Sequence, residues 1–226
     1  GVTSIGYGAF SKSALHSVEM PEGVLSIGML AFNGCPNLTD FTIPNSVKSI
    51  GNSAFWGCTA LTKLVLPESL EIIDNAVFGF CSSLTEITIP ESVTAIGDRA
   101  FIGCSALNNL EMPVKLVSIG SQAFYGCAAF TSVVLHNDVT SISTLAFGNC
   151  PLLEKIYCHA IVPPTAVAVG NYPTFNKYDG VTLYVPEGSV EAYKSTDPWS
   201  NFFVKEFDPT SIDEVVSDNA AGVTVE

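Results

Sequence analysis

The stretch SIGSQAFYGC, residues 118–127, contains no residues of obvious chemistry, yet close versions of it recur along the chain. SIGMLAFNGC begins at Ser26, SIGNSAFWGC at Ser49 and AIGDRAFIGC at Ala95. The phenylalanine of this motif returns after 22 residues and then after every 23, at Phe10, Phe32, Phe55, Phe78, Phe101, Phe124 and Phe147. A fixed period of this length is the signature of a solenoid, in which each repeat is one coil stacked on the last.

The composition agrees with a solenoid. Apolar residues make up 47% of the 226 residues and charged residues only 14%, as expected where every coil buries its inner side chains. The net charge of −13 argues against nucleic acid and anionic membranes as partners. The sequence has neither an 18-residue apolar run nor a signal peptide, so membrane insertion is not expected. It opens within a repeat, so we expect a fragment, with weak end-to-end self-association through its open first coil.

A second motif lies between the phenylalanines, for example LTDFTIP from Leu38 and LTEITIP from Leu84. Apolar and polar residues mostly alternate before the proline, as in a strand, and proline ends the strand because it cannot donate to a ladder. Stacked coils would place these strands about 4.8 Å apart in one parallel sheet. The predicted strands are residues 15–20, 38–43, 61–66, 84–89, 107–112, 130–135, 153–158 and 181–185.

The return half of each coil carries three columns of small residues. The glycine column (Gly6, Gly28, Gly51, Asp74, Gly97, Gly120, Ser143) predicts a left-handed backbone at that position. The alanine column, Ala31 and its equivalents, predicts a site with room for a methyl group. The cysteine column (Cys35, Cys58, Cys81, Cys104, Cys127, Cys150) does not converge as metal ligands do, and side chains in register disfavour disulfides. We therefore expect these cysteines and Cys158 to be reduced and buried.

The repeat L-x-x-L-x-L-P followed by S-L-x-x-I-G-x-x-A-F-x-x-C resembles the BspA-like leucine-rich repeats. The resemblance covers residues 1 to about 158, and residues 181–203 resemble the segment that closes many such arrays. It implies an α/β solenoid: a right-handed superhelix with one parallel sheet on its concave face, short turns or 3₁₀ segments on its convex face, and a C-terminal cap. It also implies a secreted or cell-surface protein associated with attachment and host-protein binding, without catalytic residues.

The expected domain organisation has three parts. Residues 1–158 form seven repeats, and residues 159–207 form an irregular loop, a last strand and the cap. In the loop, Tyr172, Phe175 and Tyr178 are expected as aromatic anchors. Trp199, Phe202 and Phe203 are expected to cover the open end of the core. Residues 208–226 are acidic and rich in small residues, which predicts a flexible linker that resembles the approach to a sorting signal.

A search for chemistry finds no catalytic, cofactor-binding or metal-binding set, so we expect no enzyme and no cofactor. The standard nucleophile, metal and phosphate motifs are absent from the sequence. His16 and His136 lie about five coils apart. Glu68 and Glu91 are expected to be neighbours at one edge, where solvated charge is weighed against a hard-cation site.

The main functional hypothesis is a protein-binding or adhesion module whose partner is a host extracellular protein or another surface protein. A glycan-binding module and a structural spacer are the alternatives. A broad, polar, mixed-charge sheet face suits a protein partner, and its candidate contact residues are Asp40, Thr42, Lys63, Glu86, Thr88 and Tyr157. A second candidate surface follows the phenylalanine column, at Trp56 and Tyr125. Those two side chains either cover the backbone between coils or form an exposed contact stripe.

Overall fold

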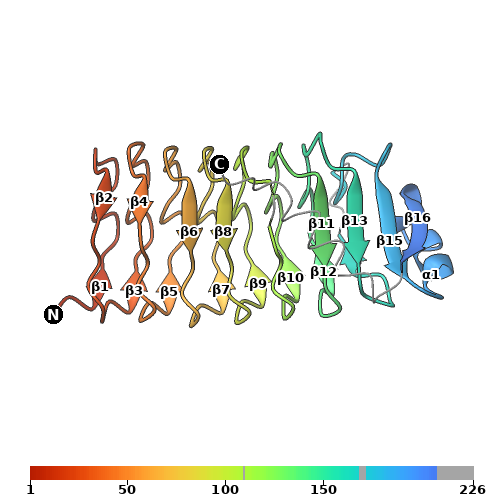
Figure 1. Ribbon diagram of the computed structural model, residues 1–226, viewed down its shortest axis with the longest axis horizontal. Helices are drawn as coiled ribbons and strands as arrows, with labels where there is room; N and C mark the ends of the chain where they lie inside the picture. The colour runs from red at the N-terminus through yellow and green to blue at the C-terminus, as the bar shows by residue number, and fades with distance from the viewer. Residues whose placement is uncertain (109, 168–171, 208–226) are drawn as a thin grey trace, which may run out of the picture.

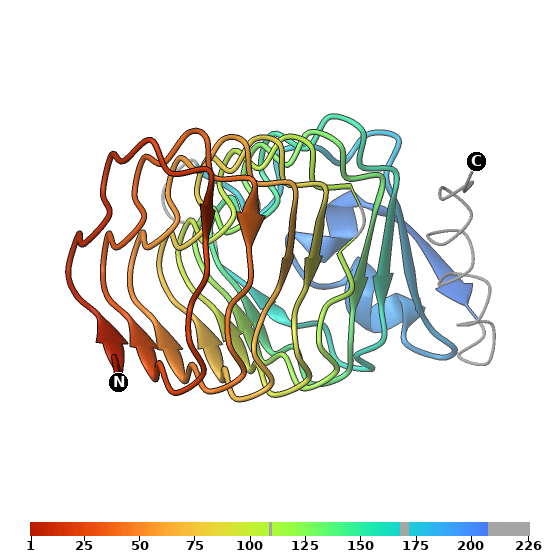
Figure 2. The ribbon, with the colours of Figure 1, turned by 60° about the vertical axis from the view of Figure 1, so that its left-hand side comes forward.

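The chain winds into a parallel-strand β-solenoid that extends along one axis (Figure 1). The computed structural model describes residues 1–108, 110–167 and 172–207. Every strand pair assigned there is parallel, and most pairs join residues one repeat apart. Figure 2 shows the coils side-on as successive loops. The predicted solenoid is confirmed, whereas the predicted linker at 208–226 lies outside the described residues.

One row of strands corresponds to the predicted sheet. Its members are β2 (Ser17–Val18), β4 (Asp40–Phe41), β6 (Lys63–Val65), β8 (Glu86–Thr88), β11 (Ser132–Leu135), β13 (Lys155–Cys158) and β15 (Thr182–Pro186). Each lies inside its predicted range or within one residue of it. Residues 107–112 contain no assigned strand in their described part, although Leu110 and Met112 are buried and Glu111 is exposed, as alternation requires. β16 (Phe203–Phe207) was not predicted; it pairs with β15 at the end of the row.

A second row of parallel strands runs along the residues just before the glycine column, mostly Ser-Ile, in the return half of each coil where no strand was predicted. It consists of β1 (Ser4–Ile5), β3 (Ser26–Ile27), β5 (Ser49–Ile50), β7 (Ile72–Ile73), β9 (Ala95–Ile96), β10 (Ser118–Ile119), β12 (Ser141–Ile142) and β14 (Thr165–Ala166). The prediction of a single sheet is therefore wrong. Two residues per coil suffice for a strand here because the isoleucine points into the core while its backbone pairs with neighbouring coils on both sides.

Helix is nearly absent, which corrects the α/β part of the predicted class. Within the described residues the helices are α1 (Val190–Lys194) and the 3₁₀ turn η1 (Trp199–Asn201), both near the C-terminal end. The repeats return through hydrogen-bonded turns rather than 3₁₀ segments. Trp199 and Phe202 are buried, but Phe203 is 64% exposed, so its predicted role in covering the core is wrong.

The core of the solenoid is a continuous stack of phenylalanine rings. Adjacent rings have centroids 5.1–5.7 Å apart and interplanar angles of 2–17°, through Phe10, Phe32, Phe55, Phe78, Phe101, Phe124, Phe147 and Phe175. The last ring comes from the predicted irregular loop, 28 residues after Phe147 rather than 23. In that loop Phe175 is buried, Tyr178 is partly buried and Tyr172 is exposed, so Tyr172 is not an anchor.

The glycine column has a different physical cause from the one predicted. Gly28, Gly51, Gly97 and Gly120 do not have positive φ. A Cβ on any of them would lie 2.6–2.8 Å from an atom of the preceding coil, so at these four positions glycine permits the close approach of the coils. The left-handed residues lie two positions later, from Leu30 (φ 59°) to Leu145 (φ 53°), and again four positions after those.

Replacing Gly120 with alanine should therefore destabilise the protein without any backbone-dihedral effect. The new Cβ would lie 2.6 Å from the Asp98 nitrogen and from the Gly97 carbonyl carbon. Overpacking of this kind costs about 1–3 kcal/mol of unfolding free energy. Gly6→Ala is the matched control, because a Cβ at Gly6 has no atom within 4 Å. Urea unfolding of the two variants measures the difference; equal stability would contradict the close-approach explanation.

Candidate functional site

The central part of the sheet face places most of the predicted contact residues together. We define the sheet face as the outward side chains of the strands from β2 to β16 in the first row. Lys63 and Glu86 are direct strand neighbours and form an exposed ion pair with Nζ and Oε2 2.8 Å apart. Thr42 and Thr88 are exposed beside them. Asp40 lies in β4, and its side chain is outside the described part of the structure.

The central sheet face is polar, open and shallow. A hollow of about 290 Å³ lies between β4 and β6, lined by residues that include Thr42, Lys63 and Val65. An exposed ion pair such as Lys63–Glu86 contributes little stability, typically below about 1 kcal/mol. These side chains are therefore available for recognition at small energetic loss.

The C-terminal end of the sheet face is aromatic. The rings of Tyr157 and Tyr184 stack with centroids 4.9 Å apart and an interplanar angle of 14°. β16 places Phe203, Lys205 and Phe207 on the same face, because alternate residues of a strand share one side. Sequence reasoning found Tyr157 but missed β16. The run Phe-Val-Lys-Glu-Phe does not alternate apolar and polar residues, and its aromatic and β-branched residues are the only strand signal it carries.

A cleft of about 800 Å³ opens beside this aromatic end. Its lining is mainly apolar and combines the segments after β11 and β13 with the ends of β15 and β16 (Asn137, Val139, Thr140, His159, Ala160, Ile161, Val162, Pro163, Pro164, Thr165, Pro186, Phe207). Ile161 and Val162 are 71% and 76% exposed at its lip. The cleft had no counterpart in the sequence predictions, because most of its lining comes from segments outside the repeat.

Two histidines meet at the same place. His136 and His159 follow paired residues of β11 and β13, and their ring centroids are 5.5 Å apart. The sequence comparison of His16 with His136 missed this pair. Burial lowers the pKa of both side chains; the neighbouring His136 lowers that of His159 further, while Glu91, the Met112 backbone, Glu111 and Asp138 partly offset the shift of His136.

The histidine pair should make stability fall in mild acid. A lowered folded-state pKa means that the unfolded chain binds protons first, near its ordinary value of about 6.5. The contribution of the pair is therefore fully present above that pH and is lost as the pH falls towards the lowered folded pKa. His159→Asn should flatten the change in urea stability between pH 7 and pH 5. An unchanged slope in the His159 variant would contradict this.

The turn stripe, defined as Trp56, Phe80, Ile102 and Tyr125, mainly covers backbone. A Cβ on Gly79 would lie 2.3 Å from the Trp56 ring, and one on Gly148 would lie 2.7 Å from the Tyr125 ring. Each of these rings therefore folds over a glycine of the next coil, which favours the first of the two interpretations.

Phe80 also folds over a glycine of the next coil, although it lies one residue after the position equivalent to Trp56 and Tyr125. It packs over Gly103 and edge-on against Trp56, with ring centroids 4.8 Å apart. Phe80 also has a left-handed backbone (φ 58°), which is unfavourable for a bulky residue, and it is 45% exposed.

The cysteine column is a ladder of buried thiols. All seven cysteines are free and buried, as predicted. In the column, each Sγ donates a hydrogen bond of 3.1–3.4 Å to the phenylalanine carbonyl of the preceding coil. Burial raises the pKa of Cys58, Cys104 and Cys150 to about 12. Reactive thiolate is therefore scarce at neutral pH.

Thiol titration at pH 8 should accordingly be slow on the native protein and complete on the unfolded one. Dithionitrobenzoate should report fewer than one fast-reacting thiol per native chain and seven in 6 M guanidinium without reductant. Fewer than seven thiols after unfolding would mean that disulfides had formed, and a fast native reaction would contradict the burial.

Of the two glutamates expected at one edge, Glu68 and Glu91, the second forms a hydrogen bond between coils. Glu91 Oε2 accepts a 2.8 Å hydrogen bond from the Val114 N–H of the next coil. Across the described residues, no group of three or more histidine, cysteine or acidic side chains is arranged to hold a metal ion. In the same residues, no helix has the length and apolar character needed to cross a membrane.

The family assignment follows from the repeat. The BspA type leucine-rich repeat region matches residues 1–105 and 71–172 in six copies. The chain belongs to this family. No curated protein matches the sequence.

Several solved structures, most of them leucine-rich repeat proteins, are similar. A protein from T. pallidum is 32% identical over 49% of this chain and 52% of its own, with a TM-score of 0.48, so the chain spans about half of that relative. A leucine-rich repeat protein from Bacteroides ovatus is 23% identical over 91% and 64% of the two chains, with a TM-score of 0.57. The pneumococcal vaccine antigen PcpA is 20% identical over 90% and 70%, with a TM-score of 0.54. The last two show the fold alone.

Proposed function

We propose that this BspA-type chain is a non-enzymatic module of a bacterial secreted or cell-surface protein, and that it binds another protein through its sheet face. The observation that carries the proposal is the exposed set of polar side chains at Thr42, Lys63, Glu86 and Thr88, the last three of which are held in strand register. These side chains stand on a fully packed scaffold, so a partner would meet a preorganised surface. The partner is a host extracellular protein or another surface protein.

We also propose that the solenoid is a right-handed superhelix with a concave sheet face and a C-terminal cap. A right-handed superhelix would curve the sheet face into a concave surface and so enlarge the contact with a rounded partner. The buried side chains of Tyr193, Trp199 and Phe202 would act as the C-terminal cap. Weak self-association through the first coil stays a prediction; Ile5 and Phe10 are only partly buried there.

A glycan-binding function has one observation in its favour, the aromatic end of the sheet face. Sugars stack on the flat faces of rings, but the faces of Tyr157 and Tyr184 lie against each other. That geometry presents ring edges and hydroxyl groups outward, which suits sugar stacking poorly. A spacer role would need only the rigid stack and is compatible with either function.

The test compares two surfaces after one partner search. The chain is applied to an array of purified human extracellular proteins and to a glycan array. Lys63→Glu with Thr88→Arg is then compared with Trp56→Ala with Tyr125→Ala on each hit, with folding checked by circular dichroism. We expect the sheet variant alone to lose binding, by at least tenfold. The reason is that its substitutions change the charge at the centre of the contact.

Three results would overturn the proposal. Hits on glycans alone would favour the glycan-binding function. Retained binding in the sheet variant together with loss in the turn variant would assign contact to the turn stripe. Absence of specific hits on both arrays would favour the spacer.

A further inference from the structure

The last three strands of the sheet face depart from the chemistry of the rest. In the register of β13, β15 and β16, one row reads Lys155, Thr182, Phe203 and the next reads Tyr157, Tyr184, Lys205. The central coils carry threonine, valine and a paired lysine and glutamate at the equivalent positions. This end of the face therefore combines two ammonium groups with two phenol hydroxyls.

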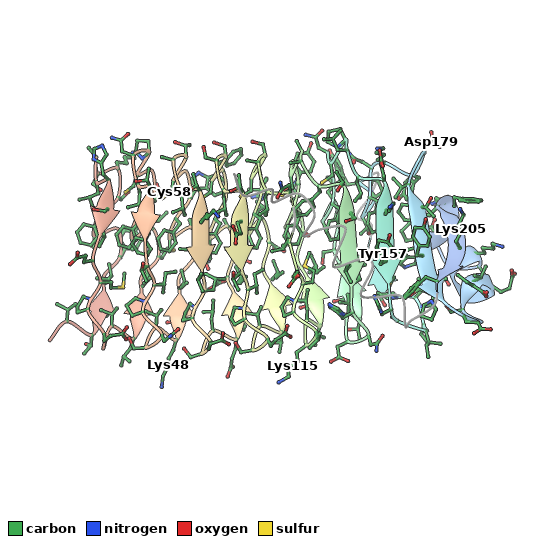
Figure 3. All side chains as sticks on the ribbon, in the orientation of Figure 1. Lys48, Cys58, Lys115, Tyr157, Asp179 and Lys205 are labelled. Atoms are coloured by element: carbon green, nitrogen blue, oxygen red, sulfur yellow. The ribbon has the colours of Figure 1, made fainter. Side chains whose placement is uncertain are left out.

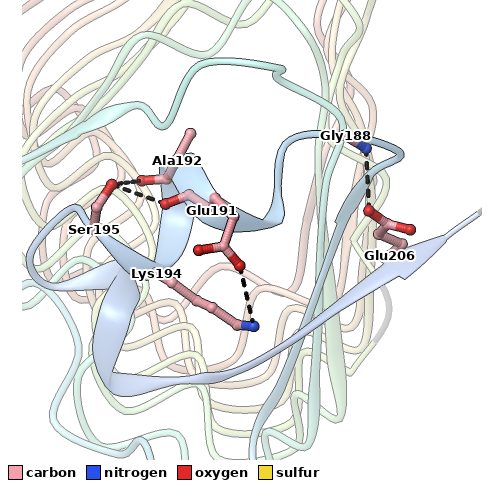
Figure 4. Close-up of polar contacts among 6 residues, drawn as sticks. All are labelled: Gly188, Glu191, Ala192, Lys194, Ser195 and Glu206. Carbon is pink, nitrogen blue, oxygen red and sulfur yellow. Dashed lines mark hydrogen bonds and ion pairs between the residues drawn. The ribbon is translucent and has the colours of Figure 1, made fainter.

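The two lysines are available to an external anion. Among the described residues, neither Lys155 nor Lys205 forms an ion pair, whereas Lys63 and Lys194 each do. Lys205 instead lies over the exposed Phe203 ring, 5.0 Å from its centroid. The sequence-adjacent Glu206 accepts a hydrogen bond from the Gly188 N–H and so ties the β15–α1 turn to β16 (Figure 4). The net charge of −13 repels acidic ligands at long range, so the attraction for a carboxylate is local and comes from these two cations.

The apolar cleft lies at the end of the same rows. His159 and Phe207 are two residues beyond Tyr157 and Lys205, and both line the cleft. Their rings meet edge-on with centroids 4.8 Å apart, so the aromatic surface continues from the tyrosines into the cleft. Exposed Ile161 and Val162 at the lip give it the lining of a site for an apolar side chain rather than for a sugar.

Resting on the proposed protein-binding function, we propose that this end of the sheet face binds an extended acidic segment of the partner, whose carboxylates meet Lys155 and Lys205 while an apolar side chain enters the cleft. Strand geometry places the two lysine Cα atoms about 12 Å apart, and Lys155 about 13 Å from His159 at the cleft. An extended chain covers the second distance in four residues. The partner motif is thus an acidic pair followed or preceded, four residues away, by an aromatic or large aliphatic residue.

The probe is a fluorescein-labelled peptide, Glu-Glu-Ser-Gly-Ser-Phe, together with its reversed sequence. One comparison peptide has lysine for both glutamates and a second has alanine for the phenylalanine. Fluorescence anisotropy on the full chain should show saturable binding of the acidic peptide below about 1 mM, weakening as salt is raised. Both comparison peptides should bind at least fivefold more weakly. Oligogalacturonate is included as a carboxylate ligand without an apolar anchor.

Matched variants separate the site from bulk charge. Lys155→Glu with Lys205→Glu should weaken peptide binding more than tenfold. Lys48→Glu with Lys115→Glu makes the same change in net charge at exposed lysines along the other edge of the solenoid (Figure 3) and should have no effect. Val162→Asp at the lip should weaken binding severalfold, whereas Leu152→Asp, also exposed but outside the cleft, should not.

The outcomes are decisive in both directions. Equal binding by the two lysine variants, tighter binding of oligogalacturonate than of the peptide, or no peptide binding in either direction of sequence would each overturn the inference. The partner found on the protein array distinguishes this failure from failure of the proposed function. If Lys63→Glu with Thr88→Arg abolishes partner binding and Lys155→Glu with Lys205→Glu does not, the sheet face still binds protein and only this end of it is excluded.

Discussion

The stack of phenylalanine rings is the constraint on which the rest of the structure depends. Eight rings in near-parallel contact fix the spacing between coils, and the backbone pairs of both strand rows must then close at the same spacing. The cysteine thiols reinforce it, because each donates to the carbonyl of a phenylalanine one coil back. A coil that shifted by one residue would lose the ring contact, the thiol bond and both strand pairings at once. This coupling explains why small residues are held so strictly at the positions between rings.

The spacing between coils also limits which side chains fit on the surface. An aromatic side chain on the turn stripe is accommodated only where the following coil offers a glycine, as with Trp56 over Gly79 and Tyr125 over Gly148. Phe80 shows the limit of that rule, since its ring lies over Gly103 from a column position that is left-handed in every coil and is occupied by glycine in most of them. The sheet face has no such restriction, because outward side chains on a flat strand need only fit their neighbours along the row. Variation for recognition is therefore easier on the sheet face than on the turns.

The repeat made most of the fold predictable from sequence. The predictions that failed concern features that the repeat pattern does not determine. The period located the strand row, the buried cysteines and the ring column, because identical spacing requires identical environments. It could not reveal the two-residue strands of the second row, since two residues carry too little alternation to distinguish a strand from a turn. The glycine column was wrongly explained by a positive φ. In a sequence, a glycine needed for a left-handed backbone cannot be distinguished from one needed for close approach of two coils. At the candidate site, Lys63 and Glu86 were placed correctly, whereas β16, the histidine pair and the cleft all depend on segments after residue 158 that do not follow the repeat.

The direction of the backbone bonds between coils has a mechanical consequence. These bonds run along the long axis of the solenoid, so a pull between the two ends loads them in opening, one coil after another, rather than in shear. With every cysteine free, no covalent link joins one coil to the next except the chain itself. Each released coil of 23 residues would add roughly 75 Å of contour length. A tether built this way yields gradually under tension and dissipates work at each step, instead of failing at a single threshold force.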